Sequence, residues 1–169
     1  MESHVVIKSA QISDVPTMQV FIFEHGVNQW NYLHRQSVSA HLADIEIGRT
    51  QALLATIDDE LAGFTTFMTS TALAHYQAPE HRGSTHGYIC EAVVHRERAC
   101  HGVGTTLLRA ATVQLAAQGF KEIYIERHEE NLASAAMMRK AGFFEIAVFK
   151  DTQRRVAGSH RTSVSRLIL

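Results

Sequence analysis

This sequence has few of the residues that crosslink small secreted domains or bind structural metals. Its 169 residues include two cysteines, Cys90 and Cys100, and no Cys-x-x-Cys pair. That excludes a disulfide framework and a cysteine-based zinc site. The sequence also lacks an apolar run of membrane-spanning length, so we expect no membrane partner. These absences favour a protein of the reducing cytoplasm.

An excess of charge of either sign is also missing. The chain carries 16 lysines and arginines against 17 aspartates and glutamates, for a formal net charge of −1. Without an overall basic field, we expect no nucleic-acid partner. A basic tail does run from Gln153 to Arg166. Because short charge clusters are usually surface features, we expect this tail to form a solvated C-terminal strand rather than a docking patch.

The remaining composition is that of an ordinary globular protein, with 46% apolar and 20% charged residues. The length suits a single domain with a sizeable core, expected to span residues 1–169. Eleven histidines are present. None of them has the His-Glu-x-x-His spacing of a zinc site, so we expect no metal cofactor.

Hydrophobic periodicity and turn residues predict an alternation of strands and helices. The expected strands are 5–7, 51–57, 61–68, 86–95, 122–126, 143–149 and 162–169, and the expected helices are 13–26, 31–43, 102–119 and 131–142, with a long loop at 70–85. The third helix has an apolar stripe that consists of Val103, Leu107, Leu108, Ala111 and Leu115. The order β-α-α-β-β-β-α-β-α-β-β predicts an α/β fold in which helices cover a mixed sheet.

The segment from Val93 to Thr105 carries the most chemistry. Gly102 and Gly104 stand between an expected strand and an expected helix. Glycine lets the backbone approach a ligand closely, and the first N–H groups of a helix suit a diphosphate. A tight turn without a ligand produces this pattern about as often. No Gly-Lys-Ser/Thr follows and no third glycine has the required spacing, which excludes a nucleotide P-loop and a dinucleotide fingerprint.

A second segment, after the next expected strand, completes a known pair of signatures. Asn131, Ser134, Gly142 and Phe143 match the pattern Asn-x-x-Ala/Ser-x-x-x-Tyr-x-x-x-Gly-Phe. Together with a preceding loop of the Gln/Arg-x-x-Gly-x-Gly/Ala type, they make the sequence resemble the GNAT superfamily of N-acetyltransferases. The element order fits that family along nearly the whole chain, although residues 1–80 carry no motif.

The resemblance implies a GNAT fold with acetyl-CoA as cosubstrate, and direct transfer of the acetyl group to a primary amine of a small molecule or peptide. It implies that Ala92, Val93 and Val94 pair through their backbone with the pantetheine arm. It also implies that Asn131 hydrogen-bonds CoA while capping its helix. It implies that the diphosphate is cradled by the backbone amides of Ala99, Cys100, His101, Gly102, Val103, Gly104 and Thr105, with Arg98 as a further candidate for binding CoA. Family habit further implies a homodimer.

Two positions depart from the family pattern. Ala99 stands where the family has Gln or Arg, so that side-chain contact is lost or is supplied by Arg98. Met138 stands where the family's tyrosine protonates the departing CoA thiolate, and methionine cannot donate a proton. The alternative is therefore a non-catalytic acyl-CoA-binding regulatory domain. A plain interaction domain that binds no CoA is a third reading.

For catalysis we expect Glu91 to act as the general base. A carboxylate within the apolar run 87–94 conflicts with its neighbours, and such conflicts tend to mark functional sites. Burial there would raise its pKa toward a useful value. A strand glutamate that faces solvent or pairs with an arginine is the plainer alternative. A backbone N–H near Val93 would stabilise the oxyanion.

The general acid has only weak candidates, Tyr124 on the following strand and Tyr88 beside Glu91. Each is more often a core residue than a catalyst. Solvent is a further proton source, because a thiol with a pKa of about 8.5 is already a fair leaving group.

The acceptor amine would lie between residues 27–44 and the 70–85 loop, by analogy with the family. Trp30, Tyr32, His75 and Tyr76 are the candidates to line it. Aromatic residues near helix starts more often pack in the core or against a cap. The sequence does not name the acceptor, because similarity of fold does not specify a substrate.

Overall fold

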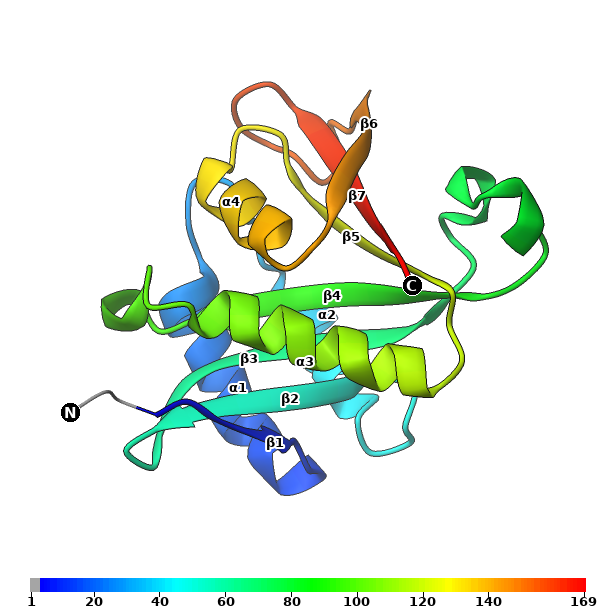
Figure 1. Cartoon of the computed structure of the whole chain (residues 1–169). Helices are drawn as coiled ribbons and strands as arrows, with labels where there is room; N and C mark the ends of the chain where they lie inside the picture. Colours follow the sequence, from blue (N-terminus) through cyan, green and yellow to red (C-terminus); the bar gives the residue numbers. More distant parts are fainter. Residues whose placement is uncertain (1–3) are drawn as a thin grey trace.

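Seven strands form one mixed sheet in the order β1-β2-β3-β4-β5-β7-β6, with helices on both faces (Figure 1). The computed structural model describes residues 4–169. The strands are β1 (Val6–Ser9), β2 (Gln51–Ile57), β3 (Glu60–Ser70), β4 (His86–Val94), β5 (Glu122–His128), β6 (Phe144–Lys150) and β7 (Arg161–Ile168). The helices are α1 (Val15–Phe21), α2 (Arg35–Ala43), α3 (Val103–Ala117) and α4 (Leu132–Lys140). Short 3-10 turns lie at Ile12–Asp14, Ala74–Tyr76, Pro79–His81 and Arg96–Arg98, and a π turn, Ile22–Gly26, extends α1. The expected α/β fold and the order of its elements are confirmed.

The helix expected at 31–43 is the one whose start differs most from the prediction, since it begins only at Arg35. The side chain of Asn28 accepts the backbone N–H groups of Trp30 and Asn31 and holds a turn there instead. Within residues 4–169, no helix is both long and apolar enough to span a bilayer.

A tight hairpin joins β2 to β3. Ile57 pairs with Glu60 across the turn, and the two turn residues, Asp58 and Asp59, adopt φ angles of 52° and 64°. A type I′ turn requires two consecutive residues with positive φ, and aspartate tolerates that conformation better than most residues. The local sequence is therefore sufficient to set this register.

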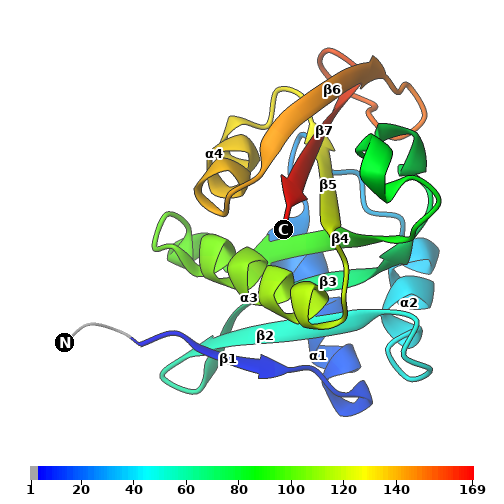
Figure 2. The ribbon, with the colours of Figure 1, turned by 45° about the vertical axis from the view of Figure 1, so that its right-hand side comes forward.

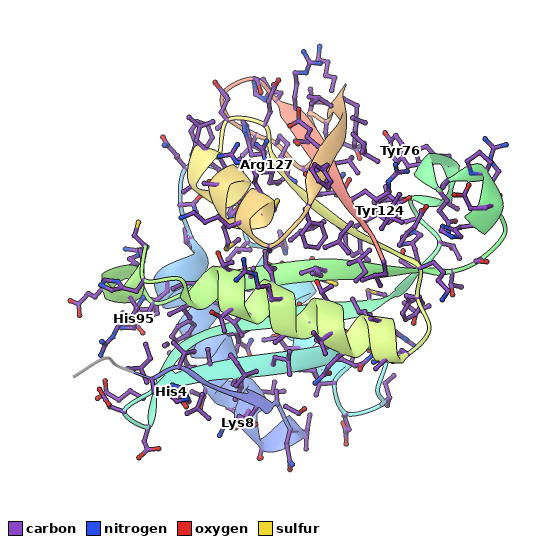
Figure 3. All side chains as sticks on the ribbon, in the orientation of Figure 1. His4, Lys8, Tyr76, His95, Tyr124 and Arg127 are labelled. Carbon is purple, nitrogen blue, oxygen red and sulfur yellow. The ribbon has the colours of Figure 1, made fainter. Side chains whose placement is uncertain are left out.

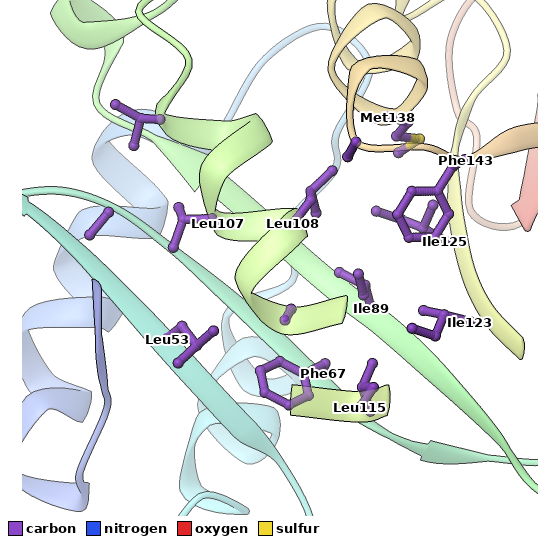
Figure 4. Packing of buried hydrophobic residues seen from close by; sticks show 14 of the residues in the cluster. Leu53, Phe67, Ile89, Leu107, Leu108, Leu115, Ile123, Ile125, Met138 and Phe143 are labelled. Carbon is purple, nitrogen blue, oxygen red and sulfur yellow. The ribbon is translucent and has the colours of Figure 1, made fainter. Parts of the chain in front are cut away.

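Two hydrophobic clusters fix the helices to the sheet. On the face drawn toward the viewer, the predicted stripe of α3 is fully buried and packs on sheet residues (Figure 4). Helix α4 joins the same cluster through Met138, next to Phe143. We call this the front face. On the rear face, α1 and α2 pack on the sheet in a cluster made of Met18, Phe21, Ile22, Val38, Leu42, Ala52, Leu54, Phe64 and Val93.

Strands β4 and β5 are parallel neighbours that pair only near their starts. Residues 87–89 of β4 pair with residues 123–125 of β5. Beyond them the strands diverge, and β5 rises away from β4 (Figures 1 and 2). We call the space between the diverging ends the β4–β5 opening. In the part of the chain that the structure describes, no strand pairs with residues 90–94 on this side.

A bulge at Cys90 accounts for the divergence. Thr66 of β3 stands opposite Glu91, whereas the next pair joins Phe67 to Ile89, so Cys90 has no partner in the register. A bulge increases the local twist of its strand. Because this one lies one residue beyond the last β4–β5 pair, it bends β4 where the opening begins.

The prediction of a solvated C-terminal strand is wrong. Strand β7 lies between β5 and β6, and its residues 162–165 are buried. In the preceding loop, Arg154 is paired with the carboxylates of Glu126 and Asp151. The sequence pattern marked these residues as surface because it cannot show which carboxylates the fold brings to them.

Buried polar groups fasten the 71–85 loop to the sheet. Glu122 accepts the backbone N–H of Ala78 at 2.9 Å and contacts Nδ1 of His81 at 3.0 Å. The fully buried His86 accepts the backbone N–H of Leu73 on its Nε2 atom at 3.1 Å. These contacts hold the loop against the rear side of β4 and β5, where they pair.

Candidate functional site

The loop before α3 presents a run of free backbone donors. Cys100 and Gly102 have positive φ angles of 65° and 80°, which turn successive peptide groups in the same direction. The first helical hydrogen bond runs from the N–H of Thr106 to the carbonyl of Gly102. Among residues 4–169, no acceptor takes the N–H groups of residues 100–105. The N–H of Ala99, which was also expected in the cradle, instead donates to the carbonyl of Arg96 at 3.3 Å. The six free donors of residues 100–105, at the positive end of a helix, form a cradle for an anion.

The two glycines of this loop have different roles. A Cβ atom on Gly102 would meet nothing within 4 Å, so its backbone is open to a ligand. A Cβ atom on Gly104 would collide with the sulfur of Met137 in α4. Gly102 therefore fits the cradle expected from the sequence, whereas Gly104 is also required by the close approach of α3 and α4.

The free edge of β4 leads from this cradle into the opening. Val93 is buried in the rear cluster, whereas Ala92 and Val94 pack against the front cluster. Their side chains thus anchor the strand on both faces and leave its backbone edge toward β5 available. This is the geometry that the expected backbone pairing with a pantetheine arm needs.

Helix α4 borders the opening from the β5 side. The Asn131 side chain caps it, because its Oδ1 atom accepts the N–H of Ser134 at 3.1 Å. The side chain of Met138 is buried in the front core (Figure 4). At the position where the family has its proton-donating tyrosine, this protein therefore has an apolar core residue that cannot donate a proton.

Glu91 lies on the rear face of β4, since it is two residues before Val93 and side chains alternate along a strand. It is half-buried, and no hydrogen bond to its carboxylate is found among residues 4–169. Burial raises its pKa to about 7, and the nearby charge of Arg155 opposes the rise. A carboxylate that titrates near neutral pH can accept a proton from an amine.

The hydroxyl groups of the two candidate acids are engaged with carboxylates. Tyr124 is fully buried at the paired end of β5 (Figure 3), and it donates to Glu122 at 2.6 Å. Tyr88 donates to Glu126 at 2.7 Å. Burial and the adjacent carboxylate raise the pKa of each tyrosine above its ordinary value. Catalysis by Tyr124 stays a prediction, and it would require the Glu122 hydrogen bond to break.

A pocket of about 570 Å³ lies between the 71–85 loop and the β6–β7 loop. His75 and Tyr76 line it, but no residue of the 27–44 segment does, so the acceptor region expected between that segment and the loop stays a prediction. Trp30 stacks on His128 instead, with 4.7 Å between ring centroids, and Tyr32 is 70% exposed. The full lining is Met68, Ser70, Ala72, Leu73, His75, Tyr76, Tyr88, Glu126, Phe149 and Arg154.

Sequence reasoning missed two polar groups that the fold brings to the site: Glu126 of β5, which lines the pocket, and Arg155 of the β6–β7 loop, whose charge acts on Glu91. The pair Arg154-Arg155 was the one signal available, and its pattern favoured a solvated surface. In the described residues 4–169, no group of three His, Cys, Asp or Glu side chains could hold a metal ion. The absence of a metal cofactor stays a prediction.

A mixed sheet that splits between two parallel strands, beside a helix N-terminus with free amides, is the architecture of an acyl-CoA N-acyltransferase. The sequence matches the model of the Acetyltransferase (GNAT) family over residues 20–143. Because this match covers most of the chain, the protein belongs to the GNAT family and is an acetyl-CoA-dependent N-acetyltransferase. The resemblance seen in the sequence is confirmed.

Solved structures with the same fold share little sequence with this chain. The ribosomal-protein-S18-alanine N-acetyltransferase of Escherichia coli has a TM-score of 0.73 at 16% identity, over 98% of this chain and 94% of that one. NAA60 of Arabidopsis thaliana, in complex with a bisubstrate analogue, has a TM-score of 0.77 at 12% identity, over 98% of both chains. RimL, a ribosomal L7/L12 alpha-N-protein acetyltransferase in complex with coenzyme A, has a TM-score of 0.73 at 15% identity, over 100% of this chain and 96% of that one. At these identities the likeness shows the fold alone, and no curated protein matches the sequence.

Proposed function

We propose that residues 1–169 act as one N-acetyltransferase domain that holds acetyl-CoA in the β4–β5 opening and acetylates an amine arriving from the rear face. The run of free N–H groups at residues 100–105, next to the free edge of β4, carries the proposal. The diphosphate would accept those N–H groups. The pantetheine arm would pair with Ala92, Val93 and Val94, which directs the thioester toward Glu91. Asn131 and the side chain of Arg98 would complete the CoA contacts.

Acetyl transfer at this position requires a base and an oxyanion donor. The amine nitrogen attacks the thioester carbonyl, so that the N–C bond forms and the C–S bond breaks as CoA thiolate leaves. Glu91 takes the amine proton directly or through one water molecule. A backbone N–H near Val93 stabilises the oxyanion of the tetrahedral intermediate.

The departing thiolate takes its proton from Tyr124 or from water. Tyr124→Phe distinguishes the two, because loss of an essential acid would lower kcat by about 10²-fold or more. An unchanged kcat, together with an unchanged thermal stability, assigns the proton to water.

The alternative function is a regulatory domain that binds acyl-CoA without turnover. The buried Met138 favours it, since no proton donor stands at the position where the family places one. Retained acetyl-CoA binding, without CoA release on a broad amine panel, would establish that alternative. We further propose that the protein works in the cytoplasm as a homodimer, without a metal cofactor and without a nucleic-acid or membrane partner.

Calorimetric titration of acetyl-CoA tests the cradle, with two matched glycine variants. We expect the wild-type protein to bind in the micromolar range, on the order of −8 kcal/mol. Gly102→Glu should abolish binding, because its carboxylate would occupy and repel the diphosphate site. Gly48→Glu is the control. Gly48 has a similar φ of 71°, and no atom lies within 4 Å of an added Cβ, so backbone strain is matched and only the location differs.

Each result has a defined meaning. If wild-type protein and Gly48→Glu bind acetyl-CoA and Gly102→Glu does not, the cradle assignment stands. If titration of the wild-type protein with acetyl-CoA shows no heat of binding and CoA does not stabilise the protein, all the site assignments above are wrong. Equal binding by all three proteins places the diphosphate elsewhere.

A further inference from the structure

Arg155, in the loop between β6 and β7, is held rigidly while the end of its side chain remains free. Its backbone N–H donates to the carbonyl of Asp151 at 2.9 Å, and its own carbonyl contacts Nδ1 of His160 at 2.7 Å. Its Nε atom donates to the hydroxyl of Thr162 at 2.8 Å. Within residues 4–169, no acceptor takes Nη1 or Nη2. The side chain is thus preorganised, and four of its N–H groups remain available.

The nearby carboxylates are already bound by the preceding residue. Arg154 donates to both oxygens of Glu126, at 2.9 and 3.2 Å, and to Asp151 at 2.7 Å. Arg155 is half-buried and forms no ion pair within the described residues. Burial lowers its pKa and the charge of Arg154 lowers it further, while the charges of Asp151 and Glu126 oppose the change. A half-buried guanidinium whose terminal nitrogens have no bonded carboxylate is stabilised when a partner from outside supplies one.

The free nitrogens of Arg155 can be reached by such a partner. In residues 4–169, the buried side-chain polar atoms without a hydrogen bond are Gln77 Oε1 and Ser159 Oγ. Since Nη1 and Nη2 of Arg155 form no hydrogen bond either, they are in contact with solvent.

Arg155 stands across the β4–β5 opening from Glu91. Val164 of β7 packs in the cluster around Tyr124 on the rear face, and Thr162 shares that face because it is two residues away. Arg155 is bonded to Thr162, so it lies on the rear side of β5 and β7. Its positive charge acts on the Glu91 carboxylate, which lies on the rear side of β4.

We propose that Arg155 binds a carboxylate of the acceptor, so that the substrate is a small amino-acid-like molecule that carries both an amine and a carboxylate. The inference rests on the proposed function, because the proposed function is what places the acceptor amine at Glu91. The planar fork of a guanidinium matches a carboxylate with two parallel hydrogen bonds. With the carboxylate bound there, the amine is oriented toward the thioester before reaction.

The surrounding loops favour a small acceptor over a protein terminus. The segment between α1 and α2 rises behind the opening (Figure 1). Its Trp30 stacks on His128 and lies against Gly158 of the β6–β7 loop, where an added Cβ would be 3.1 Å from the indole ring. This bridge joins two walls of the site and limits the passage for an extended peptide.

Matched acceptor pairs test the inference. Each pair is an amino acid and its primary carboxamide, drawn from the common α-amino acids and from short ω-amino acids, with CoA release as the readout. We expect kcat/KM to favour the carboxylate member of at least one pair by 10-fold or more. Basicity works against this preference, because a carboxylate holds the neighbouring amine more protonated.

Three variants assign the preference to Arg155. Arg155→Met should reduce the carboxylate preference to threefold or less, mainly through KM, and Arg155→Lys should restore part of it because the charge remains without the fork. Arg161→Met is the control, since Arg161 is exposed and its partner is Glu129. Rates are compared on the high-pH plateau, where a change in the Glu91 pKa has no effect. Calorimetry of the N-acetylated amino acid with CoA should show the same loss of affinity in Arg155→Met.

The possible outcomes distinguish failure of carboxylate binding by Arg155 from failure of the proposed acetyltransferase activity. If neutral amines or peptide N-termini are acetylated and no carboxylate-bearing amine is preferred, the inference is overturned and the transferase stands. If Arg155→Met slows both members of a pair equally, Arg155 acts only on Glu91 and the inference is again overturned. If acetyl-CoA binds and no amine of any class is acetylated, the inference and the proposed transferase both fall.

Discussion

Glu91 is the residue at which stability and activity oppose each other. Its carboxylate is half-buried beside apolar side chains, and the resulting pKa of about 7 lies above its ordinary value of 4.5. The folded state therefore binds a proton more tightly than the unfolded state does. Stability from this group is complete below pH 4.5 and is lost as the pH rises through about 7. The deprotonated form that destabilises the fold is the form that a base requires.

Replacing Glu91 by glutamine should stabilise the protein and inactivate it. At pH 8 we expect unfolding to cost on the order of 2 kcal/mol more than in the wild-type protein, because the buried charge is absent. The gain should vanish at pH 4. We expect kcat/KM to fall by about 10²- to 10⁴-fold. Urea unfolding at both pH values and steady-state kinetics measure the two effects.

The pH profile supplies the control for this prediction. The wild-type kcat/KM should rise with pH around 7, and Glu91→Gln should lose that step while keeping any step due to the acceptor amine. Glu60→Gln, at the exposed hairpin turn, should change neither stability nor rate. A wild-type profile that is flat between pH 6 and 8 would remove Glu91 as the base.

At the scale of single elements, helix α4 combines a structural and a binding role at its first turn. Asn131 caps the helix through Ser134, and the family resemblance assigns the same side chain to CoA. The cap needs one acceptor oxygen, whereas an amide also offers two donor hydrogens. The two roles can therefore be separated by chemistry.

Asn131→Ala and Asn131→Ser separate them. The alanine variant should lower the free energy of unfolding by about 1 kcal/mol, and the serine variant should restore most of it because serine is a good cap. We expect both variants to bind acetyl-CoA about fivefold more weakly, as loss of one hydrogen bond predicts. Urea unfolding and calorimetry provide the measurements. If Asn131→Ser binds like the wild-type protein, Asn131 is only a cap.

At the scale of the whole molecule, the 71–85 loop ties one wall of the pocket to the sheet through groups that titrate. Burial lowers the pKa of His86, and this effect outweighs the opposite influences of the Gly87 carbonyl and Glu122. The neutral ring accepts the Leu73 N–H on Nε2, and its other nitrogen contacts the Gly87 carbonyl at 3.2 Å. Protonation of Nε2 would remove that acceptor.

The loop should therefore loosen in mildly acidic solution. The unfolded-state pKa of His86 is 6.5 and its folded-state pKa is lower. Its contribution is complete above pH 6.5 and falls as the pH decreases toward the folded-state value. We expect amide hydrogen exchange in residues 71–85, corrected for intrinsic rates, to be faster at pH 5.5 than at pH 7.5, while α3 is unchanged.

His86→Gln should remove most of that pH dependence, because glutamine can accept the Leu73 N–H without titrating. His25 and His41, whose pKa values burial also lowers, remain in the variant. The difference between the two proteins thus isolates His86. Identical pH dependence in both would show that His86 does not hold the loop.

Much of the fold could be predicted because its signals are local. The α3 stripe, the Asp58-Asp59 turn and the Asn131 cap each depend on residues within one element or turn. Two linked signatures were likewise enough to indicate the family, since both lie in continuous segments. The predicted start of α2 was wrong because the Asn28 turn competes with helix formation. Hydrophobic periodicity does not detect a side chain that bonds to the backbone.

The sequence by itself determined the order of elements, the glycine loop before α3 and Glu91 as a polar residue in an apolar strand. Only the tertiary structure decided what surrounds that carboxylate. Arg155 acts on Glu91 although 64 positions separate them in the chain, and Arg154 rather than Arg155 takes the carboxylates of Glu126 and Asp151. The physical reason is that charge, burial and hydrogen bonding at the site depend on distances between remote segments. A bulge at Cys90 and a β7 strand inserted between β5 and β6 set those distances.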